Sequence, residues 1–473
     1  MIEIVPSTYL AAAMIGAMLA MGQRRGLLMF FAMMPLGAAA AFNLPAVGGA
    51  SFGIKELAVI ALLGAVVFAP RGVDATLGTL RPGQPGALAL LLLLYALISA
   101  LWVPTIFQGM TEVFTISRSV NTNGIIAIPL RPTSGNITQL FAITISLGAF
   151  LALATQARKF PDPARIVGAM AIATAINFAL GLADVASAAL GQSWLLDPLR
   201  TANYSILSEA RVMGVKRMIG GFPEASSFGS FSMGLLGFWL HQLLAGQRTR
   251  LSAGMLAVAL LCVLRSTSSG AYVALAIFAS GYALWWLAGG AVRRVSRRAG
   301  IVAVAALLAG WSAVAVLAAA YFADGAVTIY LDQILFDKLG SASGVERMSW
   351  NLQALRNFWE TALIGAGLGS ARASNWLLSS LGSIGLPGTL LFLAFLMAIF
   401  RIRTLEAGPA TAAGVTVTAL KSACAATLAS ELLIASTPNL GVFFFALAGL
   451  ATGLARSAQV VRPAPAPRVP APA

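Results

Sequence analysis

Long apolar stretches alternate with short polar ones along most of the chain, and this pattern predicts membrane-spanning helices. A bilayer core about 30 Å thick is crossed by roughly 20 apolar residues in helical form. The approximate spans are residues 7–22, 27–42, 57–70, 87–107, 137–155, 166–189, 225–245, 251–268, 270–289, 301–322, 376–400, 411–435 and 439–455. Strand-like alternation is absent, so we expect an all-α polytopic membrane protein with about 12–14 transmembrane helices.

Composition agrees with this prediction. Hydrophobic residues make up 59% of the 473-residue chain and charged residues only 10%, against about 25% charged residues in soluble domains. The two cysteines, Cys262 and Cys424, both fall within predicted spans, and the one histidine, His241, lies near the end of a span. We therefore expect no disulfide framework, no metal site and no cofactor.

The net charge of +15 is explained by the distribution of basic residues along the chain. Many basic residues fall in alternate short loops at 23–26, 71–83, 156–165, 246–250, 292–298 and 401–403. The positive-inside rule makes that side cytoplasmic and gives an external N-terminus. The sequence thus predicts no nucleic-acid partner, a single transmembrane bundle over 1–455 and a Pro-rich cytoplasmic tail over 456–473.

Three long connections, 108–136, 190–224 and 323–375, fall on the external side. The third predicts an amphipathic helix, because Ser343 and Glu346 have capping-box spacing. Apolar residues then recur at helical spacing at Met348, Leu352, Leu355, Trp359 and Ala362. We expect the polar residues of this helix to turn away from that stripe, namely Ser349, Gln353, Arg356 and Glu360.

Basic residues gather in these external segments around one carboxylate, Glu224. They are Arg211, Lys216, Arg217, Arg265, Arg347 and Arg356. Arginine binds phosphate oxygens in pairs and stays charged, so the set could hold a lipid-linked diphosphate. A neighbouring carboxylate could accept a proton from an attacking hydroxyl. Two simpler interpretations stay open: Glu224 only caps the following helix, and the arginines bind lipid headgroups or pair with acids.

The order of several motifs resembles the O-antigen polymerase and O-antigen ligase superfamily over roughly residues 200 to 400. The motifs are GFPEASSF at 221–228, RSTSSGAY at 265–272, Arg347 three residues before Trp350, LIGAGLGS at 363–370 and the NWLL segment that begins at Asn375. The FPEASSF element and the segment 129–140 are similar to exopolysaccharide polymerases.

This resemblance implies a GT-C-like transferase of the bacterial inner membrane with its active site on the external, periplasmic face. Its donor would be an undecaprenyl-diphosphate-linked oligosaccharide, used without metal, and membrane lipid, a chain-length regulator and a flippase would be its other partners. By position, Arg211 or Arg217, Arg265 and Arg347 match basic residues near the diphosphate. Ligases carry a histidine where this chain has Ser374 before Asn375, which favours a polymerase in which Glu224 is the base.

We therefore expect 190–224 to be the external catalytic loop, with Glu224, Arg211, Arg217 and Arg347 as catalytic residues. Lys216, Arg265 and Arg356 would bind the diphosphate. The alternatives are an O-antigen ligase that transfers glycan to lipid A-core, and a transporter or flippase of lipid-linked glycans. Ionisable residues within predicted spans, namely Asp184, Lys421 and Glu431, favour the transporter.

Overall fold

The computed structural model of the protein describes residues 2–45, 50–119, 122–212, 214–288, 342–402 and 411–457, with isolated positions between 312 and 329. The basic loop 292–298, most of the predicted span 301–322, the residues 330–341 of the third external connection and nearly all of the Pro-rich tail lie outside the described residues.

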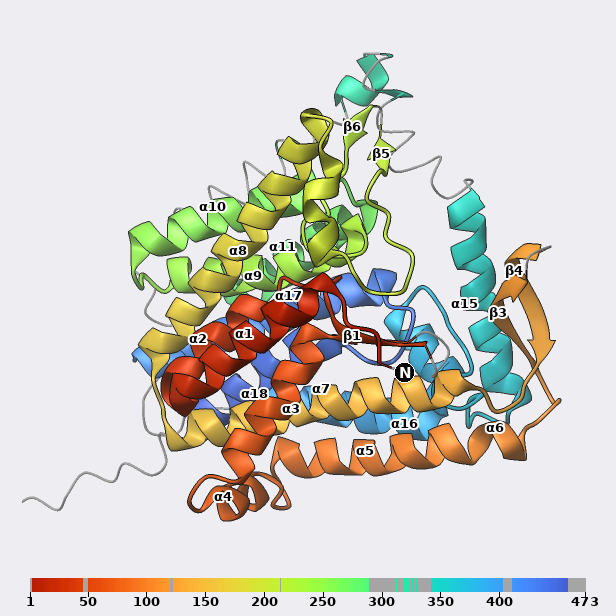
Figure 1. The fold of residues 1–473 in the computed structure, drawn as a ribbon, viewed down its shortest axis with the longest axis horizontal. Helices are drawn as coiled ribbons and strands as arrows, with labels where there is room; N and C mark the ends of the chain where they lie inside the picture. Colours follow the sequence, from red (N-terminus) through yellow and green to blue (C-terminus); the bar gives the residue numbers. More distant parts are fainter. Residues whose placement is uncertain are drawn as a thin grey trace, which may run out of the picture.

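Helices dominate the described chain (Figure 1). The first half holds α1 (Pro6–Ala20), α2 (Gly22–Met33), α3 (Ile54–Val67), α4 (Gly72–Thr79), α5 (Pro85–Leu101), α6 (Val103–Ile106), α7 (Ser134–Lys159) and α8 (Pro163–Ala189). The second half holds α9 (Ala225–Leu244), α10 (Thr249–Arg265), α11 (Ser269–Leu287), α15 (Ala342–Glu360), α16 (Trp376–Arg401), α17 (Ala412–Ile434) and α18 (Gly441–Ser457). Most of these helices coincide closely with the predicted spans.

Five described helical segments are long and apolar enough to cross a membrane: Pro85–Ile106, α7, α8, α16 and α17. The pair α3 and α4, bent by 112° between its members, makes a sixth if it counts as one span. Helices α1 and α18 are apolar but shorter. The prediction of an all-α polytopic membrane protein is therefore confirmed, whereas the total of about 12–14 transmembrane helices stays a prediction.

Short antiparallel hairpins in the described connections are a feature that the hydropathy pattern missed. They pair β1 (Ala40–Leu44) with β2 (Ala50–Gly53), β3 (Glu112–Ser119) with β4 (Thr122–Pro129), and β5 (Arg211–Val212) with β6 (Val215–Lys216). Each hairpin lies in a segment between helices, so the membrane-spanning core remains helical. The predicted span 27–42 is shortened for this reason: its helix ends at Met33, and the chain becomes a strand at Ala40.

Small residues let the helices approach closely. In α18, a Cβ atom on Gly449 would lie 2.5 Å from the carbonyl oxygen of Phe150 in α7, and one on Gly453 would lie 2.3 Å from that of Ala154. This Gly-x-x-x-Gly spacing is typical of membrane helix pairs, because small residues allow backbone contact where no hydrophobic effect drives association. The core therefore depends on shape as much as on apolarity.

The predicted amphipathic helix of the third connection is present as α15, which lies across one end of the bundle, opposite to α4 (Figure 1). It ends at Glu360, earlier than Ala362, whose backbone is left-handed with φ 50°. The glycines at 365, 367 and 369 have positive φ and pack against other backbone segments. They therefore mark a tight turn region after the helix, as the sequence indicated.

Candidate functional site

A cavity of about 330 Å³ lies where the first turns of α3 and α9 meet the last turn of α17 and the start of α18. Its apolar lining includes Phe222, Phe231 and Phe443. Its polar lining comprises Lys55, Tyr204, Glu224, Ser227, Ser230, Thr427, Glu431, Ser436, Thr437 and Asn439. The volume lies at the lower end of the range for small-ligand sites, and the convergent polar groups are the usual mark of one.

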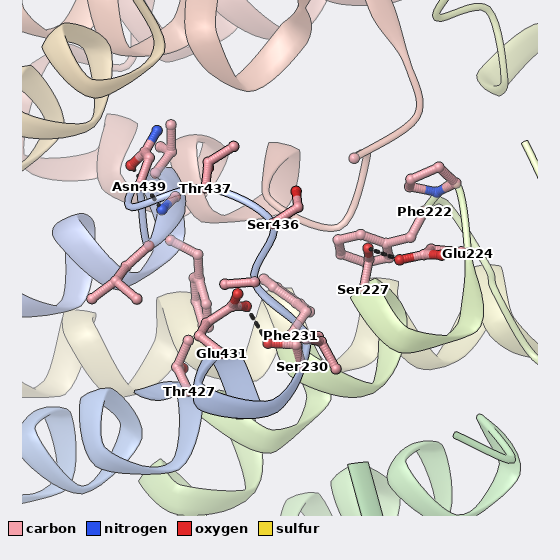
Figure 2. Close-up of a pocket in the computed structure, with 18 of the residues that line it drawn as sticks. Phe222, Glu224, Ser227, Ser230, Phe231, Thr427, Glu431, Ser436, Thr437 and Asn439 are labelled. Carbon is pink, nitrogen blue, oxygen red and sulfur yellow. Dashed lines mark hydrogen bonds between the residues drawn. The ribbon is translucent and has the colours of Figure 1, made fainter. Parts of the chain in front are cut away.

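Glu224, the residue that precedes α9, lines this cavity (Figure 2). Its backbone is extended, and its carbonyl oxygen accepts the helical hydrogen bond from the amide of Phe228 at 3.2 Å. The carboxylate accepts hydrogen bonds from the hydroxyls of Ser226 and Ser227, the latter at 3.5 Å, and makes no capping bond to a backbone amide. Glu224 therefore occupies the N-cap position, but its side chain faces the cavity, so capping alone does not account for it.

A second carboxylate, Glu431 of α17, lines the same cavity (Figure 2). Its Oε1 accepts a hydrogen bond from Ser230 of α9 at 2.6 Å. Two glycines of α9 bring the helices this close: a Cβ on Gly237 would lie 2.6 Å from the carbonyl oxygen of Ser422, and one on Gly234 would lie 2.6 Å from Oγ1 of Thr427. Because α9 and α17 pack tightly here, the start of one helix meets the end of the other.

The sequence interpretation assigned Glu431 to the transporter alternative and did not place it beside Glu224. Its position near the end of the predicted span 411–435, just before the turn residues Ser436-Thr437-Pro438, was the available signal. Lys55 was also missed as a site residue. It lies in the first turn of α3, half-buried, with its Nζ 3.8 Å from Glu56. Lys55, Glu224 and Glu431 thus line the same cavity.

Arg217 is the predicted cation on which the charge of Glu224 acts. Burial lowers the pKa of the Arg217 guanidinium, while the negative charge of Glu224 opposes that shift and the positive charge of Arg347 adds to it. Nη2 of Arg217 donates to the carbonyl oxygen of Thr267 at 3.3 Å. The loop before α9 and the exposed start of α15 therefore place Glu224 and Arg347 within electrostatic reach of Arg217.

Three other predicted cations lie elsewhere. Arg211 is exposed on the β5–β6 hairpin, where Nη1 donates to the carbonyl oxygen of Gly214 at 3.3 Å. Arg265 ends α10 partly exposed, and its carbonyl oxygen accepts from the amide of Met218 at 3.2 Å. Arg356 is exposed on α15. None of the three lines the described cavity, and neither Arg217 nor Arg347 is among its lining residues.

Lys216 is turned away from the cavity into a buried cluster of charges around Asp184, near the end of α8. The carboxylate of Asp184 is fully buried and accepts from Nζ of Lys216, from Nη2 of Arg200, and from the amides of Ile219 at 2.9 Å and Gly220 at 3.3 Å. A buried carboxylate is tolerated when it is paired and hydrogen-bonded in this way. We therefore assign Lys216 and Asp184 to the architecture of the loop and to neither a diphosphate site nor a transport path.

Lys421, the third intramembrane charge, lies earlier in α17 and donates to the carbonyl oxygen of Ile402 at 3.2 Å. At Ser374, the position where ligases carry histidine, the backbone amide donates to Oδ1 of Asn351 at 2.8 Å. The next residue, Asn375, caps α16 by accepting from the amides of Leu377 and Leu378 at 2.9 and 3.1 Å. Its Nδ2 donates to the carbonyl oxygen of Leu432, the neighbour of Glu431, at 2.6 Å. This segment thus borders the cavity through α17.

The chain matches no family model and no curated protein. The superfamily indicated by the order of motifs therefore stays a resemblance.

Proposed function

We propose that this protein is a glycan polymerase of the bacterial inner membrane, with a GT-C-like bundle of about 12–14 spans and its site on the external face. It would transfer an oligosaccharide from an undecaprenyl diphosphate carrier to a sugar hydroxyl of a second lipid-linked glycan. The observation that carries the proposal is the carboxylate of Glu224, which lines a polar cavity at the end of the bundle, while the charges of Glu224 and Arg347 both act on Arg217.

In the proposed reaction, the carboxylate and the arginines have different roles. The acceptor oxygen forms a bond to the anomeric carbon of the donor as the bond from that carbon to the diphosphate oxygen breaks. Glu224 accepts the proton of the acceptor hydroxyl. Arg217 and Arg347 stabilise the negative charge that grows on the departing diphosphate, an effect that is larger in a site shielded from bulk water.

Glu431 has the geometry of an acceptor-binding group. Its Oε1 is held by Ser230, and the other carboxylate oxygen is available to accept from a sugar hydroxyl. Lys55 offsets part of the negative charge of the two carboxylates in the cavity. Serine, threonine and asparagine side chains around them supply the donors and acceptors that sugar hydroxyls need.

The test is a gel of product size after purified protein in lipid vesicles receives its host's undecaprenyl-diphosphate oligosaccharide without metal or nucleotide. A ladder spaced by one repeat unit is the expected result, and the Glu224→Gln variant should give none. Transfer only after addition of a lipid A-core acceptor would establish a ligase instead. Movement of the glycolipid between leaflets without transfer would establish a transporter, for which the buried pairing of Asp184 gives little support.

A further inference from the structure

Helix α15 exposes an apolar side and buries polar residues on the opposite side. The exposed residues form one stripe at alternating spacings of three and four, which we call the α15 stripe: Val345, Met348, Leu352, Leu355 and Trp359. Their exposed fractions run from 37% for Leu355 to 64% for Trp359. On the opposite side Gln353 and Asn357 are only 8% and 1% exposed. Trp350, Ala354 and Phe358 are buried as well, so α15 is apolar on both sides, whereas a helix at a water surface keeps its exposed face polar.

The buried side is fixed by specific contacts. Nε2 of Gln353 donates to the carbonyl oxygen of Glu112 at 2.6 Å, and the hydroxyl of Thr111 donates to the carboxylate of Glu360 at 2.5 Å. Ala354 lies against Gly382 of α16, where an added Cβ would come within 2.8 Å of the Ala354 carbonyl oxygen. These contacts determine which side of α15 faces outward, so the exposed stripe is a consequence of packing.

The point at which α15 crosses α16 sets its depth relative to the membrane. Arg401, the last residue of the apolar helix α16, lies 19 positions after Gly382, which gives a helical length of about 28 Å, and the bend at Gly385 shortens it somewhat. The hydrocarbon core is about 30 Å thick. Since Arg401 belongs to the basic end of the bundle, α15 lies where the hydrocarbon core ends on the opposite side.

We propose that the α15 stripe is inserted into the lipid of this membrane boundary, so that α15 is an interfacial helix. Tryptophan is enriched at that depth, and Trp359 is the most exposed member of the stripe. Arginine beside an apolar face complements anionic headgroups, and Arg356 lies exposed one position after Leu355. The inserted helix also carries Arg347, so insertion keeps that cation at the level of lipid headgroups.

A nitroxide on α15 tests the proposal in the full chain reconstituted into phosphatidylethanolamine and phosphatidylglycerol vesicles. The variants are Leu352→Cys on the stripe and Glu346→Cys, an exposed residue off the stripe on the same helix. The unmodified chain gives the labelling background, because Cys262 and Cys424 are 1% and 0% exposed. Collisions with dissolved oxygen, which concentrates in lipid, are compared with collisions with a water-soluble nickel chelate.

We expect the ratio of oxygen to nickel collisions to be several-fold higher at position 352 than at 346. Equal ratios at the two positions would overturn the proposal. Spin–spin broadening at position 352 that disappears on dilution with unlabelled protein would overturn it too, because the stripe would then contact a second copy. Met348→Cys supplies a second stripe position if Leu352→Cys reduces the yield of folded protein.

Discussion

Two groups of charged residues each include members of the segment that leads into α9, and they are arranged in opposite ways. Around Asp184, two cations and two backbone amides donate hydrogen bonds to both carboxylate oxygens. Around Glu224 and Glu431, serine hydroxyls are the hydrogen-bond partners of the carboxylates among the described residues, and both carboxylates line a cavity. In a chain this apolar, a charge indicates chemistry only where its hydrogen-bonding capacity is not already filled.

The comparison assigns stability to one cluster and activity to the other. Lys216 and Arg217 are neighbours in sequence but belong to different groups: one is bonded to Asp184, and the other is acted on by the charge of Glu224. Substitutions in the two clusters should therefore separate the yield of folded protein from the rate of transfer.

The largest effect on activity is expected from Glu224→Gln. The amide cannot accept the proton of the acceptor hydroxyl, so transfer should fall by about 100-fold to 10,000-fold. Its oxygen can still accept from Ser226 and Ser227, so thermal unfolding in detergent should change little. Normal product length from folded Glu224→Gln protein would remove Glu224 from the reaction.

The largest effect on stability is expected from Asp184→Asn. Loss of the carboxylate leaves Lys216 and Arg200 buried without their counter-charge, which should cost about 3–5 kcal/mol. The measurement is the unfolding temperature in detergent together with transfer per folded molecule. The variant should unfold at a clearly lower temperature, while its remaining folded fraction keeps its rate. An unchanged unfolding temperature would contradict a structural role for the cluster.

Arg217→Lys should weaken use of the donor by about tenfold to 100-fold, because lysine keeps the charge but loses the planar pair of donors. The expected signature is a higher KM for the lipid-linked donor. Arg356→Lys, on the exposed side of α15, is the matched control and should leave the KM unchanged. Equal changes in the two variants would contradict the assignment of Arg217 to the diphosphate.

Glu431→Gln and Lys421→Met compare two charges of the same helix. Glu431→Gln replaces the charged hydrogen-bond partner of the acceptor with a neutral amide, which should reduce transfer by about tenfold. Lys421→Met changes a residue outside the cavity and should leave transfer per folded molecule unaltered. A larger loss of activity in Lys421→Met than in Glu431→Gln would favour the transporter alternative.

The smallest effect is expected from Arg211→Ala. The motif comparison left Arg211 and Arg217 as equivalent candidates, but Arg211 is exposed and bonded within its own hairpin. Its removal should change unfolding free energy by no more than about 0.5 kcal/mol. Transfer should also remain close to normal, and a loss as large as that of Arg217→Lys would return Arg211 to the catalytic group.

Much of the fold followed from the sequence because helix formation and apolar burial are local properties. The predicted span 225–245 and the observed helix Ala225–Leu244 differ by one residue at one end. The amphipathic helix of the third connection was found in the same way, although its end was placed too late, at Ala362 instead of Glu360. Hairpins in the connections were missed, since their short strands carry no strong periodic signal.

For the candidate site, the sequence alone identified Glu224 as a carboxylate at the start of a helix, and it identified Arg217 and Arg347 as cations at the same end of the bundle. Only the tertiary structure placed Glu431 beside Glu224, although 207 positions separate them in the chain. Only it turned Lys216 towards Asp184 and the α15 stripe outward. Composition and periodicity decide which segments become helices, whereas glycine contacts such as those of Gly234 and Gly237 decide which helix ends meet.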